Sequence, residues 1–171
     1  MTRTPGHPAK IRFRDGASPP WIRVDWPGSR ATARILVLFA DNQADALPTE
    51  LCVDPGLLVI TASCVRAAEA IGVAEWSADH AADLGAAPDL LFVAGMGVFG
   101  RLAAGVALHA RDRRWPVIAG QVLVDPSLEP APGDAGPYAA PLRARSVVGV
   151  ASATVVTTAR ADGRTYVDRL R

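Results

Sequence analysis

The clearest chemical signature lies in residues 91–105, LFVAGMGVFGRLAAG, where an apolar run meets a glycine-rich turn and a helical stretch. A strand, a tight turn and a helix form the setting in which a G-x-S-x-G nucleophile elbow presents a catalytic serine. Here the turn reads Gly95-Met96-Gly97-Val98, and glycine stands at position 97, where the serine would be. Because glycine has no side-chain oxygen, we expect the backbone of an elbow without its nucleophile.

Other polar side chains that could bind or react with a ligand directly follow the apolar runs. The carboxyl ends of parallel strands often form ligand sites. They are Asp41, Asn42, Gln43, Ser63, Cys64 and Asp125. Cys64 precedes a helical stretch, and a helix N-terminus can lower the pKa of a thiol, so a reactive Cys64 stays open beside a buried structural one. Cys52 and Cys64 lack the spacing of zinc ligands, and we expect neither a metal nor a cofactor.

None of the three histidines is expected to act as a catalytic base. His7 lies in the polar, proline-containing start of the chain, whereas His80 and His109 fall inside helical stretches, away from the strand ends. Asp162 could be an acidic group of a site, but it also stands where a residue would cap the helical stretch that follows.

Continuous apolar runs predict strands buried on both faces, which is typical of a parallel sheet covered by helices. The runs span 34–40, 56–64, 90–94, 118–124 and 147–158. Helical spacing of apolar residues predicts helices over 65–84, 98–113 and 163–171. Residues 10–14 and 21–26 alternate in polarity and predict a pair of antiparallel edge strands. The expected class is α/β, with a mostly parallel, doubly wound sheet of about six to seven strands and helices on both faces.

Length and composition favour a single domain over residues 10–171, after a flexible lead-in of residues 1–9. The 171 residues carry a net charge of +1, which offers no basic surface for nucleic acid or for an anionic membrane. The start of the chain lacks the apolar segment of a secretion signal, and no run of about eighteen apolar residues occurs. The sequence therefore predicts a cytoplasmic protein.

The stretch from Ala74 to Pro126 resembles the α/β-hydrolase fold, most closely the esterases and acetyl hydrolases of its hormone-sensitive-lipase-like branch. Residues 91–95 are similar to the strand that enters the family's elbow, and residues 102–113 are similar to its elbow helix. With the apolar strand that ends at Phe39, the likeness extends over roughly residues 22–171. The resemblance implies an ancestry among esterases that use a serine, a histidine and an acid.

The chain departs from that family at the positions that would carry the chemistry. The nucleophile position holds Gly97, and Asp41-Asn42-Gln43 replaces the glycine-rich loop whose backbone N–H groups form the oxyanion hole. An anionic Asp41 would oppose a developing oxyanion. In the family the catalytic acid follows the strand that corresponds to residues 153–158, and here only Asp162 could be its remnant.

The family's catalytic histidine comes after one further strand, which would lie beyond Arg171, and its cap corresponds only to the proline-rich residues 127–146. The resemblance thus predicts a truncated domain with a reduced cap and without the C-terminal part. We expect a catalytically degenerate protein that acts as a binding or assembly module, as a homo-oligomer or in a complex with a paralogous hydrolase, because uncovered sheet edges favour association. Two alternatives stay open: an enzyme of non-triad chemistry (a lyase, isomerase or cyclase) that holds a small molecule in the remnant pocket, and residual carboxylesterase activity.

Overall fold

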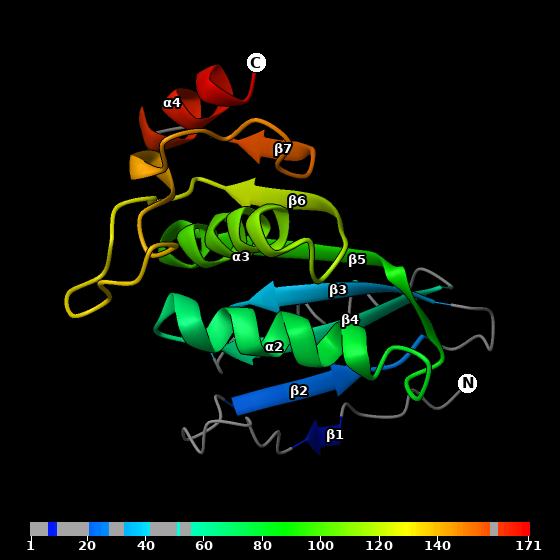
Figure 1. The fold of residues 1–171 in the computed structure, drawn as a ribbon. Coiled ribbons are helices and arrows are strands. Elements are labelled where there is room, and N and C mark those ends of the chain that lie inside the picture. The colour runs from blue at the N-terminus through cyan, green and yellow to red at the C-terminus, as the bar shows by residue number, and fades with distance from the viewer. Residues whose placement is uncertain (1–6, 10–20, 28–32, 42–50, 52–55, 158–160) are drawn as a thin grey trace.

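The computed structural model describes residues 7–9, 21–27, 33–41, 51, 56–157 and 161–171. Within these residues one seven-stranded sheet has the order β1-β2-β4-β3-β5-β6-β7 (Figure 1). Its strands are β1 (His7–Ala9), β2 (Trp21–Asp25), β3 (Ala33–Phe39), β4 (Leu57–Ser63), β5 (Ala86–Met96), β6 (Ile118–Val124) and β7 (Ala153–Val156). The strand number and the α/β class agree with the sequence prediction.

Strand direction also follows the prediction for the centre of the sheet. β2 runs antiparallel to both β1 and β4, whereas β3, β4, β5, β6 and β7 pair in parallel. The predicted edge pair needs a correction at its first strand. The partner of β2 is His7–Ala9, which falls in the segment expected to be a flexible lead-in, while residues 10–14 lie outside the described residues.

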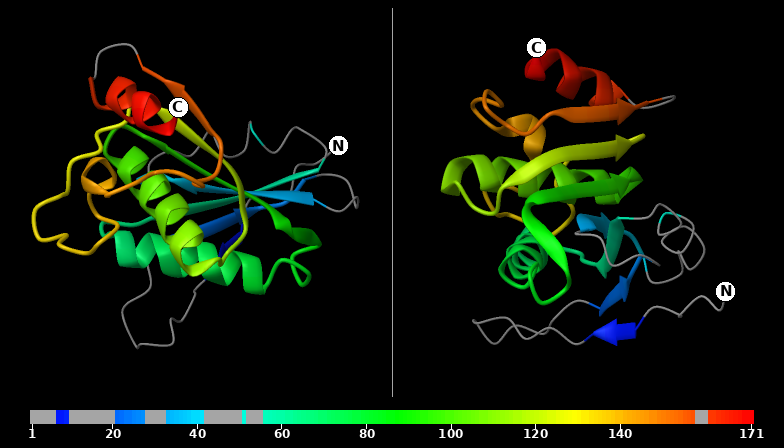
Figure 2. Two further views of the ribbon diagram at one scale, coloured as in Figure 1. Left: turned by 45° about the horizontal axis from the view of Figure 1, so that its top comes forward. Right: turned by 90° about the vertical axis from the view of Figure 1, so that its right-hand side faces the viewer.

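Three helices connect and cover these strands: α2 (Ala67–Asp79), α3 (Gly100–Arg113) and α4 (Ala161–Leu170). Two short 3-10 helices, η1 (Gly97–Phe99) and η2 (Pro141–Arg143), complete the described helical elements. The helices α2 and α3 lie side by side on the same face of the sheet (Figures 1 and 2). On the opposite face Leu51, a helical residue, packs against a second buried cluster that contains Leu36, Leu38 and Val59.

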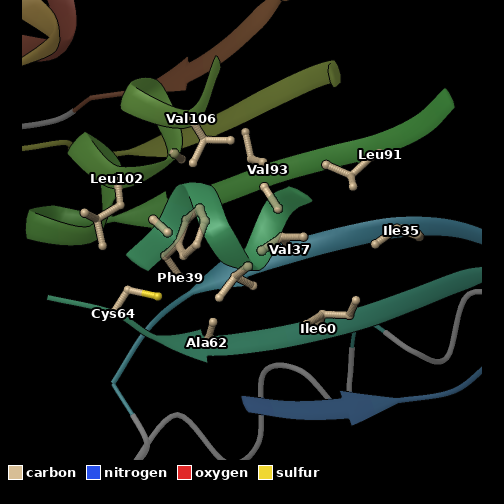
Figure 3. Close-up of a cluster of buried hydrophobic side chains, with 14 of the residues drawn as sticks. Ile35, Val37, Phe39, Ile60, Ala62, Cys64, Leu91, Val93, Leu102 and Val106 are labelled. Atoms are coloured by element: carbon tan, nitrogen blue, oxygen red, sulfur yellow. The ribbon is translucent and has the colours of Figure 1, made fainter. Parts of the chain in front are cut away.

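The main core lies between the sheet and the pair α2 and α3. Ile35, Val37 and Phe39 alternate along β3 with Leu36 and Leu38, so each set faces one side of the sheet, and Figure 3 shows the first set among core side chains under the helices. A helix that is buried nearly all round carries apolar or small side chains on every face. The helix α3 follows this rule, since every residue from Leu102 to Leu108 is buried.

The long segment between β6 and β7 contains little regular structure, yet side chains from the helices hold it in place. The guanidinium of Arg169 donates to the carbonyl oxygens of Leu142 and Ala144, and Arg111 Nη1 donates to Ser146 O over 2.6 Å. The segment also covers α3, because a Cβ on Gly105 would lie 2.4 Å from Tyr138 O. This proline-rich segment is therefore a fixed layer over α3.

Candidate functional site: the glycine elbow

The elbow predicted from the sequence is present in the backbone. β5 ends at Met96, Gly97 adopts a φ of +55°, and η1 leads directly into α3 at Gly100. A positive φ is a conformation that glycine adopts readily and that other residues adopt only with strain. A Cβ built on Gly97 would meet no atom of the described residues within 4 Å. The turn therefore presents position 97 at its apex, and the apex faces open space.

Two neighbouring glycines are held by contact. A Cβ on Gly95 would lie 2.3 Å from Phe99 O, and a Cβ on Gly100 would lie 2.6 Å from Pro126 Cβ, distances at which the backbone would have to move. The amide of Ser127 donates to Gly97 O over 2.8 Å and ties the segment after β6 to the turn. Packing thus requires glycine at positions 95 and 100, whereas only the φ angle favours it at position 97.

Exposed apolar side chains surround the apex. Met96 and Val98 are 54% and 57% exposed, and Val65, which follows β4 at the same edge of the sheet, is also exposed. Phe99 instead packs against the main core. Because Met96 and Val98 project into solvent, neither of them fills the space in front of Gly97.

A buried ion pair, which sequence reasoning missed, stands directly behind the elbow. Arg101 Nη1 lies 2.8 Å from Asp134 Oδ2, and both side chains are only 6% exposed. Arg101 Nη2 donates to Val65 O over 2.6 Å, and the amide of Ala67 donates to Asp134 Oδ2 over 3.0 Å. The pair joins the starts of α2 and α3 to the segment after β6. An arginine in the first turn of an apolar helix, where the helix dipole disfavours a cation, was the signal available in the sequence.

The suggestion that Cys64 is reactive, or is a polar group of the pocket, is wrong. Cys64 lies in the main core, where burial, and secondarily the charge of Glu69, raise its pKa to about 12 (Figure 3). A thiol with this pKa stays protonated at neutral pH and is a poor nucleophile. Ser63, the last residue of β4, is half-buried beside it in the chain.

The structure places the three acidic candidates in different surroundings, and only one of them next to the elbow. Asp125 directly follows β6 and has a φ of +41°. Val124, the residue before it, pairs with Met96, the residue before Gly97, so Asp125 lies next to the elbow at the sheet edge. Asp41 is exposed just after β3, whereas Asn42 and Gln43 lie outside the described residues. Asp162 Oδ2 accepts a hydrogen bond from the amide of Leu128 over 2.9 Å, so this carboxylate supports the segment after β6.

The histidines lie far from the apex. His80 Nδ1 is 2.9 Å from Trp76 O, and its ring stacks on the Trp76 indole. His109 Nε2 is 3.0 Å from Glu75 Oε1, and this histidine lies nine positions after Gly100, or about 14 Å along the helix axis. β1, which contains His7, is four strands away from β5 in the sheet, a distance of about 19 Å.

The described residues contain neither a metal-binding cluster nor a membrane-spanning helix. Among them, His, Cys, Asp and Glu side chains form no group of three or more that could hold a metal ion. Their helices include none with the length and apolar character needed to cross a membrane.

Comparison with known proteins places this arrangement in context. Residues 65–136, which include α2, the elbow and α3, match the family model of the alpha/beta hydrolase fold. A solved arylesterase structure is similar with a TM-score of 0.83 and 22% identity, over 99% of this chain and 73% of that chain. An esterase from Pyrobaculum calidifontis is similar with a TM-score of 0.81 and 22% identity, over 94% of this chain and 70% of that chain.

A bacterial heroin esterase has a TM-score of 0.76 and 20% identity, over 88% of this chain and 64% of that chain. The search of curated proteins gave no match. At these identities the structural likeness concerns the fold.

Proposed function

Because this chain has the α/β-hydrolase fold, as its sequence resemblance predicted, we propose that it is a catalytically degenerate relative of the esterases with that fold. In this proposal the elbow binds a small ligand and does not cleave it. The observation that carries the proposal is Gly97, which stands at the apex of an intact elbow with open space before it and no side chain.

The loss of serine-hydrolase chemistry follows from two requirements. Covalent catalysis needs a nucleophilic atom at the apex and a base within hydrogen-bond reach of it. Gly97 supplies no such atom, and neither His80 nor His109 can reach the apex from its helix. A serine placed at position 97 would therefore lack a histidine among the residues of this chain that the structure describes.

Ligand binding is supported by what remains at the apex. Met96 and Val98 offer apolar contact on either side of the open position. The first turn of α3 holds no acidic residue, and the charge of Arg101 is balanced by Asp134, so the partial positive charge of the helix N-terminus favours an oxygen atom of the ligand. The ligand class that fits is a small acyl compound, with a carbonyl or carboxylate group and an apolar tail.

Hydrolysis of p-nitrophenyl acetate and p-nitrophenyl butyrate tests the loss of catalysis. We expect the purified chain to release p-nitrophenol no faster than buffer, and we expect Gly97→Ser to be equally inactive. Turnover by the unmodified chain would establish residual esterase activity and overturn the proposal. Turnover that appears only in Gly97→Ser would show that a base does reach the apex.

Calorimetric titration with butyranilide, an uncharged acyl compound that is stable in neutral water, tests the binding site. We expect Val98→Asp to abolish the binding heat and Val117→Asp to leave it unchanged, because both valines are exposed and Val117 follows α3 at the opposite edge of the sheet. Equal binding by the two variants, or none by the unmodified chain, would contradict an acyl-binding elbow.

Non-triad enzyme chemistry is the second candidate, and the place of Asp125 favours it. A carboxylate that follows β6 beside the apex could accept or donate a proton to a bound ligand. Mass spectrometry of a binding acyl compound recovered after incubation separates the two candidates. An unchanged ligand supports simple binding, whereas a product that disappears in Asp125→Asn supports an enzyme.

A further inference from the structure

Two exposed valines occupy equivalent positions before the helices α2 and α3. Val65 lies two residues before α2 and is 68% exposed, and Val98 lies two residues before α3 and is 57% exposed. We propose that Val65 sets the length of acyl tail that the elbow binds, and that Arg101 and Asp134 are the positioning residues that hold Val65 in place. This inference rests on the proposed function and adds the ligand specificity of the same site.

The packing of the two helices sets the distance between these valines. The helices α2 and α3 lie side by side (Figures 1 and 2), and the axes of packed helices are about 8–10 Å apart. Arg101, the second residue of α3, reaches across this space and donates from Nη2 to Val65 O over 2.6 Å. A short acyl group at the apex therefore contacts Met96 and Val98, whereas a longer tail that crosses toward α2 meets Val65.

Both backbone groups of Val65 are held by hydrogen bonds. Its amide donates to Glu69 Oε2 over 2.9 Å, and its carbonyl oxygen is the acceptor for Arg101. The amide of Ala67 donates to Asp134 Oδ2 over 3.0 Å and fixes the start of α2. Segments that join strands to helices at the surface are commonly mobile. Because this one is fixed, a ligand that contacts the Val65 side chain avoids the entropy cost of ordering a loop.

Arg101 and Asp134 act on the ligand through Val65 and do not touch it themselves. Their side chains are only 6% exposed, and Arg101 Nη1 lies 2.8 Å from Asp134 Oδ2, so the two charges balance each other below the surface. The side chain that they present to the ligand is apolar. Each methylene that an acyl tail buries against such a side chain raises the affinity about fourfold.

Calorimetric titration with acetanilide, butyranilide and hexananilide tests the role of Val65. We expect hexananilide to bind about tenfold more tightly than butyranilide. Val65→Asp should abolish this gain and leave the affinity for butyranilide unchanged. The matched control is Val148→Asp, which should retain the gain, because Val148 is 82% exposed and its carbonyl oxygen lies 3.4 Å from Arg111 in the last turn of α3, away from the elbow. A gain that survives in Val65→Asp would overturn the inference.

The double variant Arg101→Met with Asp134→Leu tests the positioning role. Val65 is still present in this variant, but its carbonyl oxygen loses the guanidinium donor. We expect the variant to bind butyranilide as the unmodified chain does and to lose the gain for hexananilide. A retained gain would show that the ion pair does not position Val65. An equal loss of affinity for both ligands would show a general structural role and would also refute the positioning role.

Hydrogen exchange of the Val65 amide, followed by NMR, tests the positioning without any ligand. We expect this amide to be protected in the unmodified chain and to lose its protection in the double variant, because the segment before α2 is then free to open. Equal exchange in both proteins would overturn the positioning role. If the unmodified chain binds none of the anilides, the acyl-binding proposal fails and the role of Val65 in tail length fails with it. If it binds butyranilide without the gain for hexananilide, this inference alone is wrong.

Discussion

Removal of the Asp134 carboxylate should destabilise the fold far more than removal of an exposed carboxylate with the same ion-pair distance. In Asp134→Ala, the Arg101 guanidinium keeps Val65 O as its one acceptor among the residues that the structure describes, and the amide of Ala67 loses its acceptor. Breaking a buried pair from one side costs about 3–5 kcal/mol, because a buried charge stays behind without its counter-charge. For a chain of this size each kcal/mol corresponds to a change in Tm of about 2–4 °C, so Tm should fall by at least about 6 °C.

The chain contains its own control for this prediction. Arg143 Nη2 also lies 2.8 Å from a carboxylate oxygen, Glu129 Oε2, but these side chains are 69% and 55% exposed. Water screens such a pair, and Glu129→Ala should cost about 1 kcal/mol or less. Urea unfolding curves of both variants, followed by circular dichroism, give the two free energies on one scale.

A double variant shows whether charge or packing is responsible. Arg101→Met with Asp134→Leu removes both charges and keeps apolar volume, and it should be more stable than Asp134→Ala, because replacing a whole buried pair by apolar residues is often neutral. The reasoning fails if Asp134→Ala costs no more than Glu129→Ala. It also fails if the double variant is the least stable of the three.

Three more predictions concern single residues. Gly97→Ala should cost about 1–2 kcal/mol for its left-handed φ, whereas Gly95→Ala should cost more because its Cβ would clash with backbone; thermal unfolding compares them. Cys64 should resist iodoacetamide in the folded chain. Because burial on folding raises the pKa of this thiol from 9.0 to about 12, the stability that the protonated thiol contributes is fully present below pH 9.0 and is lost as the pH rises toward 12. Although partial burial acts to raise the pKa of Glu69, hydrogen bonds from the Val65 and Arg66 amides and the Arg66 guanidinium hold it below its usual value. The unmodified chain should therefore lose stability as the pH falls through that lowered pKa, and Glu69→Gln should flatten this loss in urea titrations.

The elements that could be predicted from sequence are the buried strands, because each of them contains a continuous apolar run. β6 has the predicted bounds, 118–124, and all of its residues except Ala119 are buried or half-buried. β7 is shorter than the predicted run of 147–158, since Val147 is buried in the core outside any strand and Gly149 turns the chain with a φ of +77°. β5 begins at Ala86, earlier than predicted, because Ala86 pairs with Ala33 across an irregularity that local polarity does not show.

At the candidate site, the backbone was predictable and the electrostatics were not. The glycine spacing indicated the turn at Gly97, because a glycine spacing is a local property of the chain. Arg101 and Asp134 are 33 positions apart in the chain. A periodic pattern among neighbouring residues cannot indicate a contact between residues so far apart. Cys64 differs from this pair, because the sequence already allowed a buried structural thiol, and its place in the main core agrees with that interpretation.

The constraints on the elbow separate its shape from its chemistry. A Cβ on Gly95 would lie 2.3 Å from Phe99 O and a Cβ on Gly100 would lie 2.6 Å from Pro126 Cβ, so replacing either glycine would disturb the junction of β5, α3 and the segment after β6. Gly97 makes no such contact, and a left-handed φ is less strained with glycine than with serine. A glycine at the apex therefore carries less backbone strain than a serine would, and the packing of the turn does not depend on which of the two is present. The surroundings of Gly95 and Gly100 therefore fix the shape of the elbow, whichever residue stands at position 97.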